Sequence, residues 1–168
     1  MDIGSMQHNP IIIAGAGPVG LTAAEILTLH DIPVIVLEQQ ATPSPEWRAS
    51  TFHAATLELL EESGISQELL ARGLVADKIQ YRDRRTGVFA QFDTSLLKND
   101  TRYPFRLQCP QSTYVQILSE RLRKNPLADL RFNSALVGFE QDDAGVTATI
   151  QTPQESYTLQ TPFLLGAD

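Results

Sequence analysis

Three glycines and one carboxylate near the start of the chain have the types and the spacing needed to hold a dinucleotide. Gly15, Gly17 and Gly20 form a G-x-G-x-x-G loop directly after an apolar run, and a second apolar run ends at Glu38. A strand, a glycine loop, a helix, a second strand and an acid, in this order, make up a dinucleotide-binding βαβ unit. The sequence therefore predicts one half of a cofactor site.

The positions of this loop have distinct physical roles. Gly15 permits the tight turn from strand to helix, Gly17 lets the backbone approach a pyrophosphate, and Gly20 lets the helix pack closely on the strand. Pro18 suits the first helical turn, where its missing N–H is no loss. Free N–H groups and the positive end of the helix dipole would then face the phosphates. The predicted phosphate-binding residues are Gly15, Ala16, Gly17, Pro18, Val19 and Gly20.

The acid at the end of the second strand completes this interpretation. A carboxylate at Glu38 can accept hydrogen bonds from ribose hydroxyls, and it would repel a 2′-phosphate, which disfavours NADP in this half-site. The simpler alternative is an ordinary α/β turn that binds nothing.

The elements that position these residues follow from the apolar pattern. Residues 11–13 are a continuous apolar run, typical of a parallel strand covered on both faces. Residues 18–29 are predicted to be helical, and residues 34–37 form a second strand. Further predicted elements are helices at 48–64, 66–72 and 112–124, a hairpin at 78–82 and 88–92, a third parallel strand at 130–132, a meander at 135–141, 146–151 and 156–160, and a further buried strand at 163–168.

Together these elements predict an α/β fold: a Rossmann-like dinucleotide-binding domain with a parallel sheet, a three-stranded β-meander and an antiparallel hairpin excursion. The hairpin does not belong to a plain doubly wound sheet, and it suggests strands that reach toward a second domain. Residues 1–6 resemble an expression scar before a native start at Met6.

Composition restricts the partners and the compartment. A net charge of −7 over 168 residues argues against nucleic acid and anionic membrane as partners. No apolar stretch approaches the roughly twenty residues of a membrane span. Cys109 is the only cysteine, so an intrachain disulfide is impossible, which suits a cytoplasmic protein.

Other reactive side chains do not predict a catalytic or metal site. His53 is expected to cap or pack a helix rather than to transfer protons, and Cys109 beside Pro110 is expected to be a small apolar filler. No histidine, cysteine and carboxylate cluster has metal-ligand spacing. We therefore predict no catalytic residue and no metal ligand in this chain.

With these motifs laid out, the chain from Pro10 to Asp168 resembles the single-component flavin-dependent aromatic hydroxylases, the FAD monooxygenases related to 4-hydroxybenzoate hydroxylase and phenol hydroxylase. The glycine loop and Glu38 are similar to the first FAD signature of that family. Four later segments are similar to further motifs of the family: Arg48-Ala49-Ser50-Thr51-Phe52-His53, Pro110-Gln111, a strand at Leu136, and Gly166-Ala167-Asp168.

The resemblance implies further FAD contacts. Arg48 would approach the pyrophosphate, Gln111 would reach the ribityl chain, Leu136 would offer backbone atoms to adenine, and Asp168 would begin an Asp-Gly fingerprint linked to FAD and NAD(P)H. Gln39 lies where many relatives have arginine, so the resemblance implies contacts to adenosine that are either weaker or differently made. From the residues alone, two alternatives remain open: Arg48 could pair with Glu46 or Glu58, and Gln111 could be an ordinary polar residue at a helix start.

The resemblance also implies an activity. NADH or NADPH would reduce the flavin, and a C4a-hydroperoxide would hydroxylate a small aromatic, phenolic substrate. The chain ends before the glycine of the last fingerprint, so we expect an inactive N-terminal part (residues 7–168) whose segment 75–110 reaches toward a missing substrate domain. The strand edges and apolar surface exposed there predict that the isolated chain forms a homodimer through that surface or aggregates. The alternatives are another FAD oxidoreductase, such as an epoxidase or isoprenoid reductase, and a non-catalytic nucleotide-binding or self-associating module.

Overall fold

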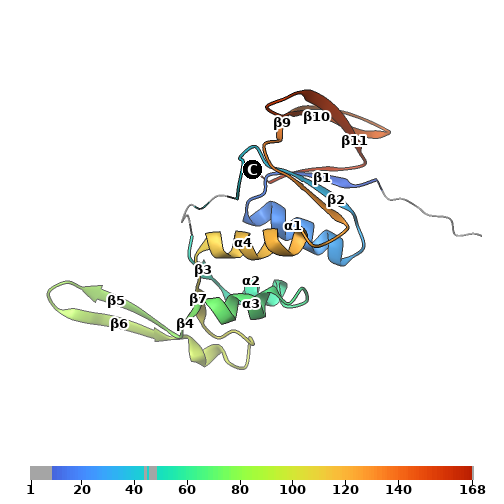
Figure 1. Cartoon of the computed structure of the whole chain (residues 1–168). Coiled ribbons are helices and arrows are strands. Elements are labelled where there is room, and N and C mark those ends of the chain that lie inside the picture. The colour runs from blue at the N-terminus through green and yellow to red at the C-terminus, as the bar shows by residue number, and fades with distance from the viewer. Residues whose placement is uncertain (1–8, 44, 46–48, 168) are drawn as a thin grey trace, which may run out of the picture. The chain divides into compact units, whose positions relative to one another are not determined.

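The computed structural model describes residues 9–43, 45 and 49–167. The chain divides into two compact units, the first made of residues 1–45 and 115–168, the second of residues 46–114 (Figure 1). Helix α4 (Gln111–Leu122) contributes its first turn to the second unit and the rest to the first.

A four-stranded parallel sheet forms the centre of the first unit. Its strand order is β12-β1-β2-β8, and all three neighbouring pairs run parallel. The predicted strands at 11–13, 34–37 and 130–132 are therefore confirmed. Their observed bounds are β1 (Ile11–Ala14), β2 (Val34–Leu37), β8 (Ala128–Arg131) and β12 (Leu164–Gly166).

One face of this sheet is covered by helix and the other by a second sheet, as Figure 1 shows. Helix α1 (Pro18–Leu29) has the predicted bounds. On the opposite face, Ile12, Ile35 and Leu37 pack with Ala148 and Ile150 of the meander in one buried cluster. Both faces of β1 and β2 are thus covered, which explains why their sequences are apolar at every position.

The predicted meander is present as an antiparallel sheet of order β11-β10-β9. The register of β9 against β10 shifts between Thr149 and Ile150, which leaves Val137 without an opposite residue. A shift of this kind is a β-bulge, which bends the strand locally. The observed strands are β9 (Ala135–Asp142), β10 (Gly145–Gln151) and β11 (Ser156–Thr161).

The second unit corrects the prediction of one helix over residues 48–64. Residues 51 and 52 instead form a short strand that pairs with residues 107 and 108, and the helix begins only at Ala54. Thr51 is β-branched and Phe52 is aromatic, and both types favour strands. The cross-strand pairing and the edge contact of the Phe52 and Tyr114 rings, whose centroids are 5.3 Å apart, outweigh the helical spacing of the leucines. The elements of this part are β3 (Thr51–Phe52), α2 (Ala54–Leu59), α3 (Ile65–Arg72), β4 (Leu74–Ala76) and β7 (Arg106–Gln108), with sheet order β3-β7-β4.

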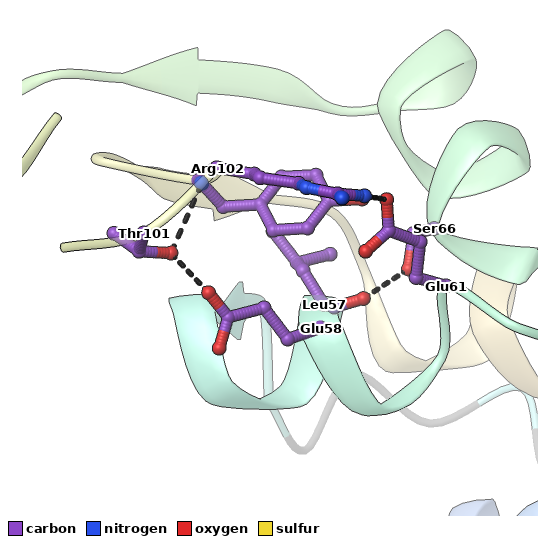
Figure 2. A network of polar contacts seen from close by, with 7 residues as sticks. Leu57, Glu58, Glu61, Ser66, Thr101 and Arg102 are labelled. Atoms are coloured by element: carbon purple, nitrogen blue, oxygen red, sulfur yellow. Dashed lines mark hydrogen bonds and ion pairs between the residues drawn. The ribbon is translucent and has the colours of Figure 1, made fainter. Parts of the chain in front are cut away.

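Two side-chain contacts join α2 and the turn that follows it to the segment before β7, as Figure 2 shows. The Thr101 hydroxyl donates to the Glu58 carboxylate at 2.5 Å, and the Arg102 guanidinium lies 2.5 Å from the Glu61 carboxylate. Behind them, the Ser66 hydroxyl donates to the Leu57 carbonyl oxygen. These contacts hold the segment against α2, so Glu58 acts here as a structural partner of Thr101.

The predicted hairpin is confirmed as β5 (Lys78–Asp83) and β6 (Gly87–Asp93), followed by a 3₁₀ turn at Thr94–Leu97. It is a separate two-stranded sheet that extends away from the helices of its unit (Figure 1). The Asp83 carboxylate accepts hydrogen bonds from the backbone N–H groups of Arg85 and Thr86, which fixes the turn as a solvated loop. Its aromatic side chains are exposed, including Phe89 at 71%.

The last predicted strand is present but is not buried. β12 is an edge of the parallel sheet, and its residues are intermediate or exposed. The apolar composition of residues 163–165 suggested burial, yet Leu165 is 38% exposed because no described strand lies on the outer side of β12. Over the described residues, no helix is long and apolar enough to span a membrane.

Candidate functional site

The glycine loop lies at the carboxyl ends of the parallel strands, between β1 and α1. The Gly15 N–H donates to the Leu37 carbonyl oxygen at 2.7 Å, which ties the start of the loop to the end of β2. Gly15 has a φ of +110°, a conformation that side-chain-bearing residues rarely adopt. The chain can therefore leave β1 and turn directly into α1.

The other two glycines fulfil different requirements. A Cβ at Gly20 would lie 1.9 Å from the Gly15 carbonyl oxygen, so the helix could not sit where it does. A Cβ at Gly17 would meet nothing within 4 Å, so protein packing does not require a glycine there. Open space beside Gly17 is what the approach of a ligand backbone or phosphate would need. The loop therefore fits a pyrophosphate.

The first turn of α1 offers hydrogen-bond donors to such a group. Gly17 is the N-cap residue of α1. It has no side chain, and among the described residues no side-chain capping hydrogen bond is made at this helix start. Pro18 has no N–H, so the amides of Gly17, Val19 and Gly20 are the ones left open by helix geometry. Val19 is 64% exposed. These amides and the helix dipole form a site for an anion.

Glu38 follows β2 directly, as predicted, and its carboxylate lies against the loop. Oε2 accepts from the Ala16 N–H at 2.9 Å, and Oε1 accepts from the Gln40 N–H at 2.9 Å. Each oxygen retains a second lone pair for a ribose hydroxyl. Gln39 beside it is exposed to solvent.

Two backbone hydrogen bonds that the sequence did not predict hold the chain at Glu38 and Gln40. The Asn133 N–H donates to the Gln40 carbonyl oxygen at 2.9 Å, and the Ser134 N–H donates to the Glu38 carbonyl oxygen at 2.8 Å. Asn133 has a φ of +52°, a conformation that asparagine tolerates better than most residues. An asparagine between two predicted strands was the signal available in the sequence.

Leu136 lies on β9, two residues past Ser134. Its side chain packs against the buried cluster of the first unit, and its residue opposite in the register is Ile150. β9 is an edge strand of its sheet, and edge strands keep some backbone N–H and C=O groups free of ladder bonds. Backbone contacts from this strand to a ligand are thus geometrically available.

The remaining predicted residues fall in the second unit or outside the described part. Gln111 begins α4, and its backbone N–H donates to the Ala49 carbonyl oxygen at 2.8 Å. Arg48 and Asp168 lie outside the described residues. A cofactor contact of Arg48 and its alternative pairing with Glu46 or Glu58 therefore remain predictions from the sequence.

His53 and Cys109 are the other side chains whose chemistry the sequence raised. His53 is the exposed N-cap residue of α2 and makes no side-chain capping bond. Cys109 is 1% exposed, and burial raises the pKa of its thiol. Within the described residues, no group of three or more histidine, cysteine, aspartate or glutamate side chains could hold a metal ion.

Comparisons with known proteins agree with this geometry. Para-nitrophenol 4-monooxygenase from Pseudomonas sp. strain WBC-3 is 31% identical over 158 residues, covering 94% of this chain and 39% of that protein. The crystal structure of p-nitrophenol 4-monooxygenase from Pseudomonas putida DLL-E4 superposes with a TM-score of 0.92 at 28% identity, covering 96% of this chain and 41% of that one.

A second similar structure is that of aklavinone-11 hydroxylase in a ternary complex with FAD and aklavinone. It has a TM-score of 0.81 at 27% identity and covers 96% of this chain and 33% of that one. The chain thus spans well under half the length of the proteins it resembles.

The family model described as "FAD binding domain" matches residues 8–168. That match takes in the glycine loop, Glu38, Gln111 and Leu136. The chain belongs to the FAD binding domain family.

Proposed function

We propose that this chain is the FAD-binding portion of a flavin-dependent monooxygenase that hydroxylates a small aromatic compound, with NADH or NADPH as the reductant. The observation that carries the proposal is the open space at Gly17, at the start of a helix whose first turn has no side-chain cap. The names of the relatives, among them para-nitrophenol 4-monooxygenase, support the aromatic substrate class.

The residues of this chain would bind and orient the cofactor. The amides of Gly17, Val19 and Gly20 would hold the pyrophosphate, and Glu38 would accept from the adenosine ribose. Arg48, Gln111, Leu136 and Asp168 belong to the proposed set through the family resemblance. Bound FAD, once reduced, would supply the oxygen chemistry, and the protein's part is to position it and exclude water.

The first experiment is a titration of the purified 168-residue chain with FAD, followed by flavin fluorescence, with NAD and NADP as competitors. Selective FAD binding that weakens in Glu38→Ala and Arg48→Ala supports the proposed site. Tight NAD binding with FAD ignored contradicts it. Binding of neither nucleotide would show that the rest of the longer protein is required to hold the cofactor.

The activity needs a second experiment on the longer protein that carries this sequence. Consumption of NADH or NADPH that depends on added phenols supports an aromatic hydroxylase. Consumption driven only by isoprenoid or alkene substrates would favour another FAD oxidoreductase, and no consumption at all would favour a binding module.

A further inference from the structure

The carboxylate of Glu38 is engaged by the protein itself on both of its oxygens. Oε2 accepts from the Ala16 N–H and Oε1 from the Gln40 N–H, each at 2.9 Å. The first of these contacts joins positions that are 22 residues apart. Hydrogen bonds to an ionised acceptor are roughly twice as strong as neutral ones, so this contact ties the glycine loop to the end of β2.

The backbone of Glu38 is fixed as firmly as its side chain. Its N–H donates to the Arg131 carbonyl oxygen at 2.9 Å, and its carbonyl oxygen accepts from the Ser134 N–H at 2.8 Å. Both partners belong to β8 or to the segment that follows it. The backbone of Glu38 is therefore held in place by β8 and by the residues that directly follow β8.

The contact also decides which loop amides are open to a ligand. The Ala16 N–H already has the Glu38 carboxylate as its acceptor, so it is not a donor to the pyrophosphate. The predicted phosphate-binding set is thereby narrowed to the amides of Gly17, Val19 and Gly20. Their orientation depends on how the preceding residue is held.

We propose that Glu38 is a positioning residue for the pyrophosphate loop in addition to its role toward the ribose. By accepting the Ala16 N–H, it sets the turn before the cofactor arrives, so that less ordering is left to binding. The inference rests on the proposed function for its ligand, FAD, but the contact itself is a property of the free chain.

Amide hydrogen exchange in the ligand-free chain tests the contact directly. In Glu38→Ala, we expect the Ala16 and Gln40 amides to exchange roughly tenfold faster or more, because both lose their acceptor. In Glu38→Gln, which keeps one acceptor oxygen, at least one of the two should accelerate. Glu140→Gln is the matched control, because Glu140 is an exposed residue of β9 and the same charge is removed. Unchanged exchange at Ala16 in both Glu38 variants would overturn the proposal.

A comparison of two ligands separates the loop contact from the ribose contact. FAD and an FAD analogue without the 2′- and 3′-hydroxyls of the adenosine ribose are titrated against the parent chain and Glu38→Ala. A positioning role predicts that the variant binds the analogue several-fold more weakly than the parent chain does. Equal binding of the analogue by both would mean that Glu38 acts through the ribose alone, which overturns the proposal.

The two experiments also distinguish this inference from the function on which it rests. If the unsubstituted chain binds no FAD, cofactor binding by this chain alone fails, yet the exchange rates still decide whether Glu38 holds the loop. If FAD binds but Ala16 exchanges equally in all variants, the function stands and the positioning role fails.

Discussion

At the scale of single residues, Gly17 and Gly20 look alike in the motif but are constrained by different neighbours. The Cβ of an alanine at Gly20 would overlap the Gly15 carbonyl oxygen, whereas at Gly17 it would meet open space at an ordinary φ of −77°. The motif predicts packing as the role of Gly20 and ligand approach as the role of Gly17. The neighbours of the two glycines in the structure agree with that division.

We therefore expect opposite phenotypes from two identical substitutions. Gly20→Ala should lower the free energy of unfolding by about 2 kcal/mol, the usual cost of overpacking, because the helix or the loop must shift. Gly17→Ala should change it by less than about 0.5 kcal/mol and weaken FAD binding roughly tenfold, because the methyl group occupies the ligand's space. Urea unfolding and flavin fluorescence measure the two effects. A Gly17→Ala chain that binds FAD normally would contradict this assignment.

Cys109 allows a prediction about pH. Burial raises the pKa of its thiol, so the folded chain keeps the thiol neutral at a pH where the unfolded chain, with a pKa of about 8.5, has begun to lose the proton. The unfolded state then binds fewer protons than the folded state, and the free energy of unfolding falls as the pH rises above about 8.5.

The measurement compares urea unfolding of the parent chain and Cys109→Ala between pH 7 and 10. The variant lacks this titration, so the stability difference between the two chains should shrink as the pH rises. A difference that stays constant over this range would show that Cys109 ionises equally in both states.

At the scale of elements, one ion pair joins two helices of the first unit. The Arg121 guanidinium of α4 lies 2.7 Å from the Glu25 carboxylate of α1, whose side chain is only 9% exposed. Arg121 is not fully buried, with 35% exposure, which weakens the pair relative to a fully buried one. The pair fixes the lateral position of α1, the helix whose first turn offers the phosphate donors.

Removing the cation should cost more than removing the anion. We expect Arg121→Met to lower the free energy of unfolding by about 2 kcal/mol, because it leaves a buried carboxylate without its partner. Glu25→Gln should cost less, and the double variant should be more stable than Arg121→Met alone. Urea unfolding of the four chains of this cycle measures the coupling. Additive effects would mean that the pair contributes nothing.

The elements also show what a sequence can and cannot predict. β1, α1 and β2 follow from local pattern, because apolar runs, a glycine loop and a helix-compatible stretch all agree there. β3 escaped prediction, because Thr51 and Phe52 become a strand only through pairing with residues far away in the sequence. The same holds for the site: the residue types at Gly15, Gly17, Gly20 and Glu38 were predictable, but the Ala16 contact of Glu38 was not, because it depends on the position of two strand ends.

At the scale of the whole molecule, an exposed cluster of aromatic residues on the hairpin coexists with a net charge of −7. The hairpin of β5 and β6 has Tyr81, Phe89 and Phe92 clustered on it, with ring centroids 6.0 to 6.3 Å from Tyr81 and more than half of each side chain exposed. An isolated two-stranded ribbon is only marginally stable in water, and an exposed apolar face of this kind favours association. Charge repulsion between copies opposes it.

We therefore expect the 168-residue chain to self-associate through the hairpin, and to do so more strongly as salt screens the repulsion between copies. Light scattering over a range of protein and salt concentrations should show a rising mean mass. Replacing Phe89 and Phe92 by threonine should reduce that rise, since threonine keeps the strand preference but removes the aromatic surface. Phe163→Thr is the matched control, because Phe163 is 67% exposed but lies in the other unit. A monodisperse monomer at high concentration and high salt would contradict the prediction, and an equal effect of the control would move the interface away from the hairpin.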